Sequence, residues 1–527
     1  MAIFSFIGFT LLVAIVSYYA TRKTDESTSD GYFLGGRSLT AGVIAASLLL
    51  TNLSTEQIVG LNGQSFSEGL LVMAWETLAA IAMVITALFL LPRYLKGGIT
   101  TIPTFLERRY NKNTKAITSG LFLTGYVVVL LPIVLYSGAL AINTMFNVPE
   151  VFGISKTAAL WMTVWGIGII GSIYAIFGGL KAVAISDTVN GIGLLIGGLM
   201  IPFFGLLVVG DGSLVEGMNT LTTAIPEKFD AVGDSSSSVP FATIFTGMML
   251  VQLFYWGTNQ AIIQRALAAK NLKEGQKGLL LGSFIKILGP LIVVLPGIIA
   301  FYLYGSEIAN PDEAYPTLVR NVLPSYLVGF FAAVLFGAIL SSFNSALNSS
   351  VTLFGIDIYK EFINKEADEK TVVKYGKLFG VGLAILSMII APFIANAPDG
   401  LFGYLQEING CYSIPILTII VVGYLTKRVP AMAANIAILS GAILYFISQF
   451  VLQPYFGKEN YPHFLHIMAI LFVFNVLLML VIGKFYPRKE SYEQVYTNQV
   501  DITPWKYAKI CGAVVVIIVI WTYIYFN

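Results

Sequence analysis

Two charged side chains inside apolar segments are the first indication of chemistry in this sequence. Glu76 is the one charged residue in LLVMAWETLAAIAMVITALFLL, and Lys286 is equally isolated in LLLGSFIKILGPLIVVLPG. A carboxylate accepts hydrogen bonds from hydroxyl groups, an ammonium donates them, and the amides of Gln57 and Gln406 do both. These four side chains suit a polyhydroxylated ligand. The alternative is a buried ion pair between Glu76 and Lys286 that links two helices.

A second group of candidate residues follows one face of an apolar helix. In the segment GFFAAVLFGAILSSFNSALNSSVTLFGIDIY, Ser341, Ser345 and Ser349 recur every four residues, so they share a helix face. Hydroxyl groups and the freed carbonyl oxygens of a broken helix together form a site of hard oxygen ligands that suits Na⁺. The same pattern fits a stripe of small residues through which two helices pack, and spacing alone leaves both interpretations open.

Polar residues interrupt two apolar segments at matching places. One segment contains LTNLSTEQIVG, which begins at Leu50, and the other contains FYWGTNQAIIQRAL, which begins at Phe254. Polar groups in hydrocarbon cost several kcal/mol unless they find partners. A single cluster of this kind often bonds to its own helix. Two clusters in corresponding positions of two halves instead predict an inverted repeat whose broken helices surround a binding site.

The elements that carry these residues belong to a membrane protein. Of the 527 residues, 56% are hydrophobic and 11% are charged, against about 25% charged in soluble proteins. The net charge of +2 gives no indication of nucleic-acid binding, and no nucleophile–base set or metal motif of an enzyme is present. About fourteen segments are long enough to cross a ~30 Å core: 2–20, 38–66, 69–94, 115–145, 156–177, 182–209, 240–268, 275–305, 322–358, 371–396, 399–426, 430–453, 460–484 and 505–526.

Lysine and arginine predict the orientation of these segments, because cytoplasmic connections carry an excess of both. With the N-terminus outside, the outer connections keep only Lys156, Lys228, Arg320 and Lys458. Both termini are therefore predicted to lie outside a plasma (inner) membrane. The longest outer connection, 210–239, is polar and ends in a serine run typical of a flexible loop. The run 2–20 lacks a basic start and a cleavage site, so we interpret it as a retained helix.

Seven motifs in the sequence resemble those of the sodium/solute symporter family, in the same order and spacing. They are DGYFLGGRSL, NLSTEQIVG, GGLKAVAISD, FYWGTNQAIIQRALAAK, VVLPGI, DIYKEFI and YLQEI. The likeness covers nearly the whole chain and is strongest to the sugar-transporting branch. It implies an all-α membrane protein with a LeuT-like inverted five-plus-five helix repeat and extra flanking helices. It also implies import of a neutral monosaccharide, a hexose like galactose or glucose, together with Na⁺ by alternating access.

The resemblance and the predicted spans divide the chain into five parts. An extra helix and a linker occupy 1–37, the first repeat 38–209, the extracellular loop 210–239, the second repeat 240–426 and further helices 427–527. The expected partners are a sugar, the sodium ion and the lipid bilayer, without nucleic acid. Two oligomeric states are compatible with the sequence, a monomer and a weak homo-oligomer.

The resemblance also implies roles for individual residues. The sugar contacts are Gln57, Glu76, Gln252, Lys286 and Gln406. The outer gate consists of Leu61, Trp75 and Phe402, and the inner gate is Tyr255. The principal sodium site is formed by the carbonyl oxygens of Leu50, Leu53 and Ala338 with the hydroxyls of Ser341 and Ser342. The resemblance leaves open whether a second sodium site exists; its ligands would be Asp187, Asn344 and Ser345.

Two departures from the galactose-transporting members concern the cargo. Those members have a serine where this chain has Ala79, and an asparagine where it has Gln252. One hydroxyl contact is lost and one amide reaches a methylene further. The cargo therefore stays open between a hexose, inositol or another polyol, sialic acid and a small carboxylate, the last disfavoured by Glu76. A non-transporting sensor or a channel on the same scaffold is the alternative class of protein.

Overall fold

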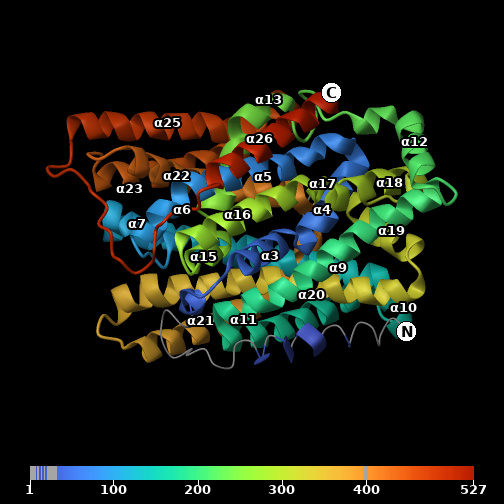
Figure 1. Cartoon of the computed structure of the whole chain (residues 1–527), viewed down its shortest axis with the longest axis horizontal. Helices are drawn as coiled ribbons and strands as arrows, with labels where there is room; N and C mark the ends of the chain where they lie inside the picture. Colours follow the sequence, from blue (N-terminus) through green and yellow to red (C-terminus); the bar gives the residue numbers. More distant parts are fainter. Residues whose placement is uncertain are drawn as a thin grey trace.

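Helices form almost the whole of the computed structural model, which describes residues 8, 11–13, 15–16, 18–19, 33–396 and 401–526. Most of them lie side by side along one long direction of the molecule (Figure 1). Within the described part, the extended pairing is confined to an isolated bridge between Leu39 and Ala269. The prediction of an all-α membrane protein is thereby confirmed.

The main helices follow one another along the chain in a simple order. They are α3 (Ala41–Asn52), α4 (Thr55–Glu68), α5 (Ala74–Ile85), α6 (Leu91–Lys96), α7 (Ile102–Arg109), α8 (Lys112–Gly125), α9 (Leu131–Phe146), α10 (Val148–Phe152), α11 (Lys156–Val209), α12 (Leu214–Ala224), α13 (Phe241–Thr243), α14 (Met249–Gly257), α15 (Gln260–Leu267), α16 (Leu272–Ile287), α17 (Gly289–Val293), α18 (Leu295–Tyr304), α19 (Ala314–Val322), α20 (Ser325–Thr352), α21 (Glu369–Ile390), α22 (Leu401–Leu425), α23 (Ala431–Ile447), α24 (Gln453–Phe456), α25 (Phe464–Phe485) and α26 (Ala508–Tyr525).

The number of membrane spans differs from the prediction. Among the described residues, 10 helices are long and apolar enough to cross a membrane, or up to 12 if each of two bent pairs is one span. The predicted number of fourteen is not confirmed by this count. The first predicted span, 2–20, lies largely outside the described residues. In addition, the segment Thr55–Lys96 is only one of the 10 helices in this number, although the chain turns within it at Gly69 (φ +84°), between α4 and the helices that follow.

Both predicted interruptions are present in the structure. Leu53 (ψ 53°) and Ser54 (ψ 173°) leave the helical region and separate α3 from α4. Thr258 (φ −136°) and Asn259 (ψ 121°) separate α14 from α15, and the segments on either side meet at 48°. The Asn259 side chain caps α15 by accepting a hydrogen bond from the backbone N–H of Ala261 (3.0 Å). Each break leaves other backbone groups free for partners outside their own helix.

A third broken helix was missed in the sequence, where 275–305 is predicted as one span. α16 ends at Ile287, and the segment formed by α17 and α18 is bent from it by 52°. Pro290 and Pro296 are the signal for this break, because a proline inside a helix removes one backbone hydrogen bond and clashes with the preceding turn. Lys286 consequently lies in the last turn of α16, where a cation is favoured by the helix dipole.

Two side chains of α4 satisfy backbone groups at a further interruption, where Val294 (φ −127°) separates α17 from α18. Asn62 accepts a hydrogen bond from the N–H of Gly297 (2.9 Å) and donates to the carbonyl of Ile292 (3.2 Å). The hydroxyl of Ser65 donates to the carbonyl of Val294 (2.8 Å). One broken helix therefore stabilises the break of another, and the outer half of α4 is attached to α17 and α18.

The connection 210–239 is more ordered than its composition predicts. It contains α12 and a 3₁₀ turn at Pro226–Phe229. The ammonium of Lys228 donates to the carbonyl groups of Phe66 (3.1 Å) and Ser67 (2.5 Å), which belong to the last turn of α4. A cation at a helix C-terminus is stabilising, and burial lowers the pKa of Lys228. The connection thus covers one end of the broken helix α4.

Both halves of α11 pack against α20. α11 contains two candidate spans, Lys156–Ile173 and Val183–Val209, in agreement with the predicted segments 156–177 and 182–209. A Cβ at Gly171 would touch Phe343, and one at Gly337 would touch Asn190, so residues from both halves lie on α20. The serine-bearing helix is thereby held by two neighbouring spans.

The close approach of α4 and α18 depends on Gly297. A Cβ at this position would overlap the hydroxyl of Ser65 and the backbone oxygen of Asn62, which cannot move aside. We expect Gly297→Ala to lower the free energy of unfolding by about 1–3 kcal/mol, measured as a lower thermal unfolding temperature of the purified protein. Gly382→Ala on α21 is the control, because no heavy atom lies within 4 Å of a Cβ there. Equal stability of the two variants would contradict the close approach.

Candidate functional site

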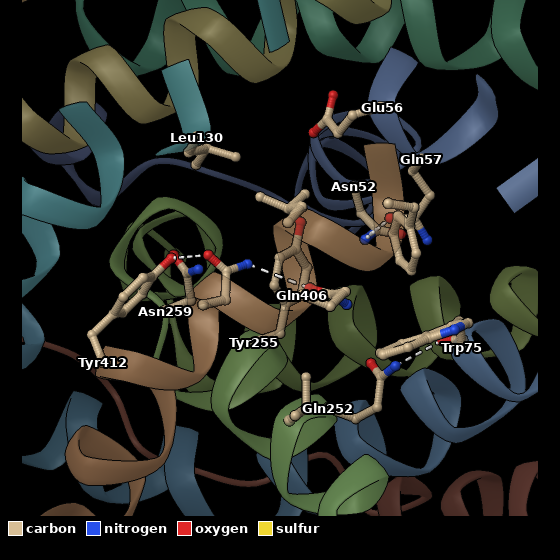
Figure 2. A pocket seen from close by; sticks show the side chains of 14 residues that line it. Asn52, Glu56, Gln57, Trp75, Leu130, Gln252, Tyr255, Asn259, Gln406 and Tyr412 are labelled. Carbon is tan, nitrogen blue, oxygen red and sulfur yellow. Dashed lines mark hydrogen bonds between the residues drawn. The ribbon is translucent and has the colours of Figure 1, made fainter. Parts of the chain in front are cut away.

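A cavity lies between the broken helices. It is lined by residues of α3, α4, α5, α14 and α22 and of the segments around Leu130 and Asn259: Asn52, Glu56, Gln57, Trp75, Leu130, Val251, Gln252, Tyr255, Asn259, Phe402, Leu405, Gln406, Asn409 and Tyr412 (Figure 2). Its volume is about 50 Å³, well below the ~300–1,000 Å³ of typical ligand pockets. The structure therefore shows the cavity in a closed form that must widen to take up a ligand.

Three of the predicted sugar contacts, Gln57, Gln252 and Gln406, line this cavity. Glu76 and Lys286 do not. The Lys286 ammonium lies 2.7 Å and 2.6 Å from the two carboxylate oxygens of Glu76, and the two side chains are 1% and 0% exposed. The ion pair that the sequence left open is thus present. Gln57 connects it to the cavity, because its amide donates to Glu76 Oε1 (2.5 Å).

Three of the four predicted gate residues line the cavity. Trp75 and Phe402 pack edge to face with their ring centroids 5.1 Å apart, and both line the cavity. Leu61 is fully buried on α4 and is not a lining residue. The ring of Tyr255 stands between Asn259 and Gln406 (Figure 2). An aromatic pair and a separate tyrosine thus border the space in which a cargo would lie.

Neighbouring groups fix the orientation of the cavity amides. Gln252 donates its Nε2 to the backbone carbonyl of Trp75 (2.9 Å), which leaves its Oε1 as an acceptor for a ligand. Gln406 accepts a hydrogen bond from Asn409 (3.3 Å), so its Nε2 remains as a donor. Asn409 is in turn held by the Tyr412 hydroxyl (2.6 Å). Both donors and acceptors therefore face the cavity.

Asn409 and Tyr412 were missed in the sequence. Their signal is spacing, because Asn409 follows Gln406 by three residues and Tyr412 follows Asn409 by three, so each pair consists of neighbours along α22. Asn52, which donates to Gln57 Oε1 (2.9 Å), was noted as polar but received no role. These three residues orient the predicted contacts, and such a supporting role is invisible until the fold brings the side chains together.

Oxygen atoms gather where the serine face of α20 meets the end of α3. Ser342 donates to the carbonyl of Thr51 (3.1 Å). The Thr51 hydroxyl lies 3.5 Å from Ser341 Oγ and 3.3 Å from Ser345 Oγ. The predicted carbonyl ligands belong to the same region, where Leu50, Leu53 and Ala338 are buried. A break in α3–α4 beside hydroxyl groups is the kind of site that holds Na⁺ in broken-helix transporters.

The predicted second sodium site contains a guanidinium group. Asp187 Oδ2 accepts from Ser47 (2.7 Å) and lies 3.4 Å from Nη2 of Arg265, which also donates to Ser345. Arg265 is 1% exposed, although it stands near the end of the predicted span 240–268, among the basic residues that the orientation rule assigns to the inner side. The third predicted ligand, Asn344, is buried, and its Oδ1 has no hydrogen-bond partner among the described residues. A second Na⁺ here would share Asp187 with the guanidinium of Arg265, which lies at Oδ2, whereas Oδ1 has no hydrogen-bond partner among the described residues.

The fold and the cavity define a class of protein. A membrane protein in which broken helices of two repeats enclose a polar cavity is a secondary transporter. The chain matches the model of the Sodium:solute symporter family over residues 32–441, and it belongs to this family.

Known proteins are similar over most of their length. The chain is 50% identical to the Uncharacterized symporter YidK of Escherichia coli (strain K12) over 512 residues, 97% of this chain and 88% of that protein. It is 34% identical to the Sodium/glucose cotransporter of Vibrio parahaemolyticus over 461 residues, 82% of each protein. The structure of a Na⁺-coupled sialic acid symporter in a substrate-bound outward-open state superimposes with a TM-score of 0.78 and 20% identity, covering 94% of this chain and 99% of that one.

These findings establish the activity at a coarse level. The protein is a multi-pass membrane protein that couples the movement of a small solute to Na⁺, and the family is one of transporters and not of enzymes. The predicted LeuT-like fold is confirmed by the structural match. Sodium is accordingly a transported ion, and the residues near Ser342 are the candidates to bind it.

The oxygen cluster generates a prediction for sodium binding. We expect Ser342→Ala to weaken the Na⁺-dependent thermal stabilisation of the purified protein about tenfold in apparent affinity, because one polar ligand worth about 1.4 kcal/mol is lost. Ser350→Ala is the control, since that hydroxyl donates to the Ala346 carbonyl of its own helix (2.8 Å). Unchanged Na⁺ affinity in Ser342→Ala would remove this hydroxyl from the site.

The buried pair of Asp187 and Arg265 generates a second prediction. Asp187→Asn leaves a buried guanidinium without its carboxylate, and we expect a loss of about 3–5 kcal/mol in the free energy of unfolding, seen as a lower unfolding temperature. The double variant Asp187→Asn/Arg265→Gln should recover part of this loss, because it removes both charges. Stability of the double variant below that of the single variant would show that the pair does not act through charge.

Proposed function

We propose that the protein imports a neutral monosaccharide, a hexose of the galactose or glucose type, into the cell together with Na⁺. The observation that carries this proposal is the set of oriented amides around the cavity. Gln252 presents a carbonyl oxygen and Gln406 an amino group, so adjacent hydroxyls of one sugar ring find an acceptor and a donor. Trp75 and Phe402 supply flat apolar surface for the ring.

The buried ion pair has a place in this proposal. Gln57 links the cavity to Glu76 and Lys286 through a short hydrogen bond. A sugar hydroxyl that takes the place of the Gln57 amide gains a charge-assisted hydrogen bond to Glu76 Oε1, and such bonds are roughly twice as strong as neutral ones. The pair therefore acts as a second layer of the site that contacts the cargo when the cavity widens.

Coupling to sodium follows from the shared helix. Thr51 and Asn52 lie at the end of α3, the first beside the serine face of α20 and the second against Gln57 of the cavity. An ion held by the proposed ligands near Ser342 favours one position of this break, and therefore one arrangement of the cavity. Each Na⁺ that enters contributes ~2.3 kcal/mol per 100 mV and ~1.4 kcal/mol per tenfold gradient. One ion then supports roughly a few-hundred-fold accumulation.

The proposal includes the organisation of the chain in the membrane. The two repeats occupy 38–209 and 240–426, and each begins with a broken helix, α3–α4 and α14–α15. The helices before and after them flank the repeats. The asymmetry of basic residues supports a plasma-membrane protein with both termini outside. Rocking of one group of helices against the other would open the inner side past Tyr255.

Other cargoes are outcomes of the same test. Inositol and related polyols present a similar set of hydroxyl groups to the amides of the cavity, so the uptake measurement must distinguish them from a hexose. Sialic acid and small carboxylates carry a negative charge. A sensor or a channel would not accumulate a solute.

Uptake into proteoliposomes tests the proposal. We expect sodium-driven accumulation of at least one of D-galactose, D-glucose and myo-inositol, and none when potassium replaces sodium. Accumulation of sialic acid with none of the three would contradict a neutral cargo. Flux that does not depend on a gradient would indicate a channel.

Glu76 provides the corresponding variant. We expect Glu76→Gln to reduce sugar uptake at least tenfold, because the amide lacks the charge that attracts hydroxyl protons. The double variant Glu76→Gln/Lys286→Met controls for an unpaired buried lysine and should remain equally inactive. Sodium-dependent thermal stabilisation should persist in the double variant. Wild-type uptake in either variant would exclude a role for Glu76 in sugar binding.

A further inference from the structure

One carboxylate of the cavity has no role so far. Glu56 lies in the first turn of α4, next to Gln57, and is 5% exposed. Figure 2 shows it on the side of the cavity away from Trp75 and Gln252. Among the described residues that line the cavity, it is the one with a carboxyl group. The other nearby carboxylate, Glu76, is already neutralised by Lys286.

The surroundings of Glu56 satisfy its carboxylate only in part. Its Oε2 atom is buried and has no hydrogen-bond partner among the described residues. The Ser54 hydroxyl and the backbone N–H of Glu56 interact with the carboxylate, and the N-terminal end of the 14-residue helix α4 favours a negative charge. Among the described residues, no ion pair joins Glu56 to a cation. A buried carboxylate in this condition is ready to accept hydrogen bonds from a ligand.

We propose that Glu56 is a specificity-determining residue of the transport cavity, which accepts a hydrogen bond from a cargo hydroxyl and excludes cargo that carries a carboxylate. This inference rests on the proposed import of a neutral sugar and narrows its substrate class. Two carboxylates in a poorly hydrated space repel each other strongly, since water screens their charges little there. A hydroxyl-rich neutral molecule instead supplies the protons that the carboxylate lacks.

The position of Glu56 makes this role separable from sodium binding. Its neighbour Gln57 faces the ion pair of Glu76, whereas the proposed sodium ligands lie at the end of α3, in the break at Leu53 and on the serine face of α20. A change at Glu56 should therefore alter which sugars bind and leave the response to Na⁺ in place.

Matched sugars that differ in charge provide the test. Wild-type protein and Glu56→Gln are reconstituted in proteoliposomes at zero membrane potential, and sodium-driven uptake of D-galactose or D-glucose is measured against competing D-galacturonate or D-glucuronate. We expect Glu56→Gln to increase inhibition by the uronate at least tenfold relative to inhibition by the unlabelled neutral sugar. Affinity for the neutral sugar should fall only a few-fold, because the amide oxygen still accepts one hydrogen bond.

Glu68→Gln is the matched control, at the other end of the same helix. The Glu68 carboxylate accepts from the backbone N–H of Ser238 (2.8 Å) and is not a lining residue of the cavity. We expect this variant to keep the wild-type preference for the neutral sugar.

Each remaining result overturns the inference in a distinct way. Neutral-sugar uptake with an unchanged uronate response in Glu56→Gln excludes Glu56 as the selective charge and leaves the proposed function intact. A loss of the sodium response in Glu56→Gln, with selectivity unchanged, assigns the carboxylate to ion binding. Failure of the wild type to take up any neutral sugar under a sodium gradient overturns the proposed function, and the assignment of Glu56 falls with it.

Discussion

Backbone groups freed by a broken helix must find partners inside the protein, because the hydrocarbon core of a membrane offers no water to bind them. The structure meets this constraint with side chains from neighbouring helices. Asn62 and Ser65 of α4 bond to the break in α16–α18, Ser342 of α20 bonds to the end of α3, and Asn259 caps α15. The breaks are thus held in place by a small set of amides and hydroxyls.

Charges in the interior follow a related rule. Glu76 is paired with Lys286 and Asp187 with Arg265, and all four side chains are almost fully buried. Each pair joins helices that belong to different parts of the chain, α5 to α16 and α11 to α15. Buried pairs contribute little net stability, but breaking one leaves an uncompensated charge. Specific pairing therefore restricts how these helices can be arranged, and it leaves Glu56 as the charge that faces the cavity.

Much of the fold follows from the sequence because lipid imposes simple rules. Apolar length predicts the helices, and the polar clusters around Asn52 and Asn259 predict two of the breaks. The third break was missed although Pro290 and Pro296 mark it, since proline also occurs in continuous membrane helices whose neighbours satisfy the freed groups. The partner in this case is Asn62, more than two hundred residues earlier, and no local pattern reveals that contact.

The candidate site was only partly accessible from the sequence. Residue type and resemblance indicate Gln57, Gln252 and Gln406, and the structure gathers these three around one cavity. Their orientation depends on Asn52, Asn409 and the carbonyl of Trp75, which are contacts that only the folded chain defines. The same is true of Arg265. Its position in the sequence is typical of a cytoplasmic connection, and only the fold brings it to Asp187.

The double use of Asn62 has a consequence for how such proteins diversify. Its amide donates one hydrogen bond to Ile58 of its own helix and one to Ile292 of α17, and it accepts a third from Gly297 of α18. Aspartate lacks the donor, and serine is too short to reach both groups. Leu61, the adjacent residue, is fully buried in the apolar core. Asn62 is therefore held by backbone atoms of other turns and helices and does not line the cavity, so cargo preference can change in this fold while Asn62 stays the same.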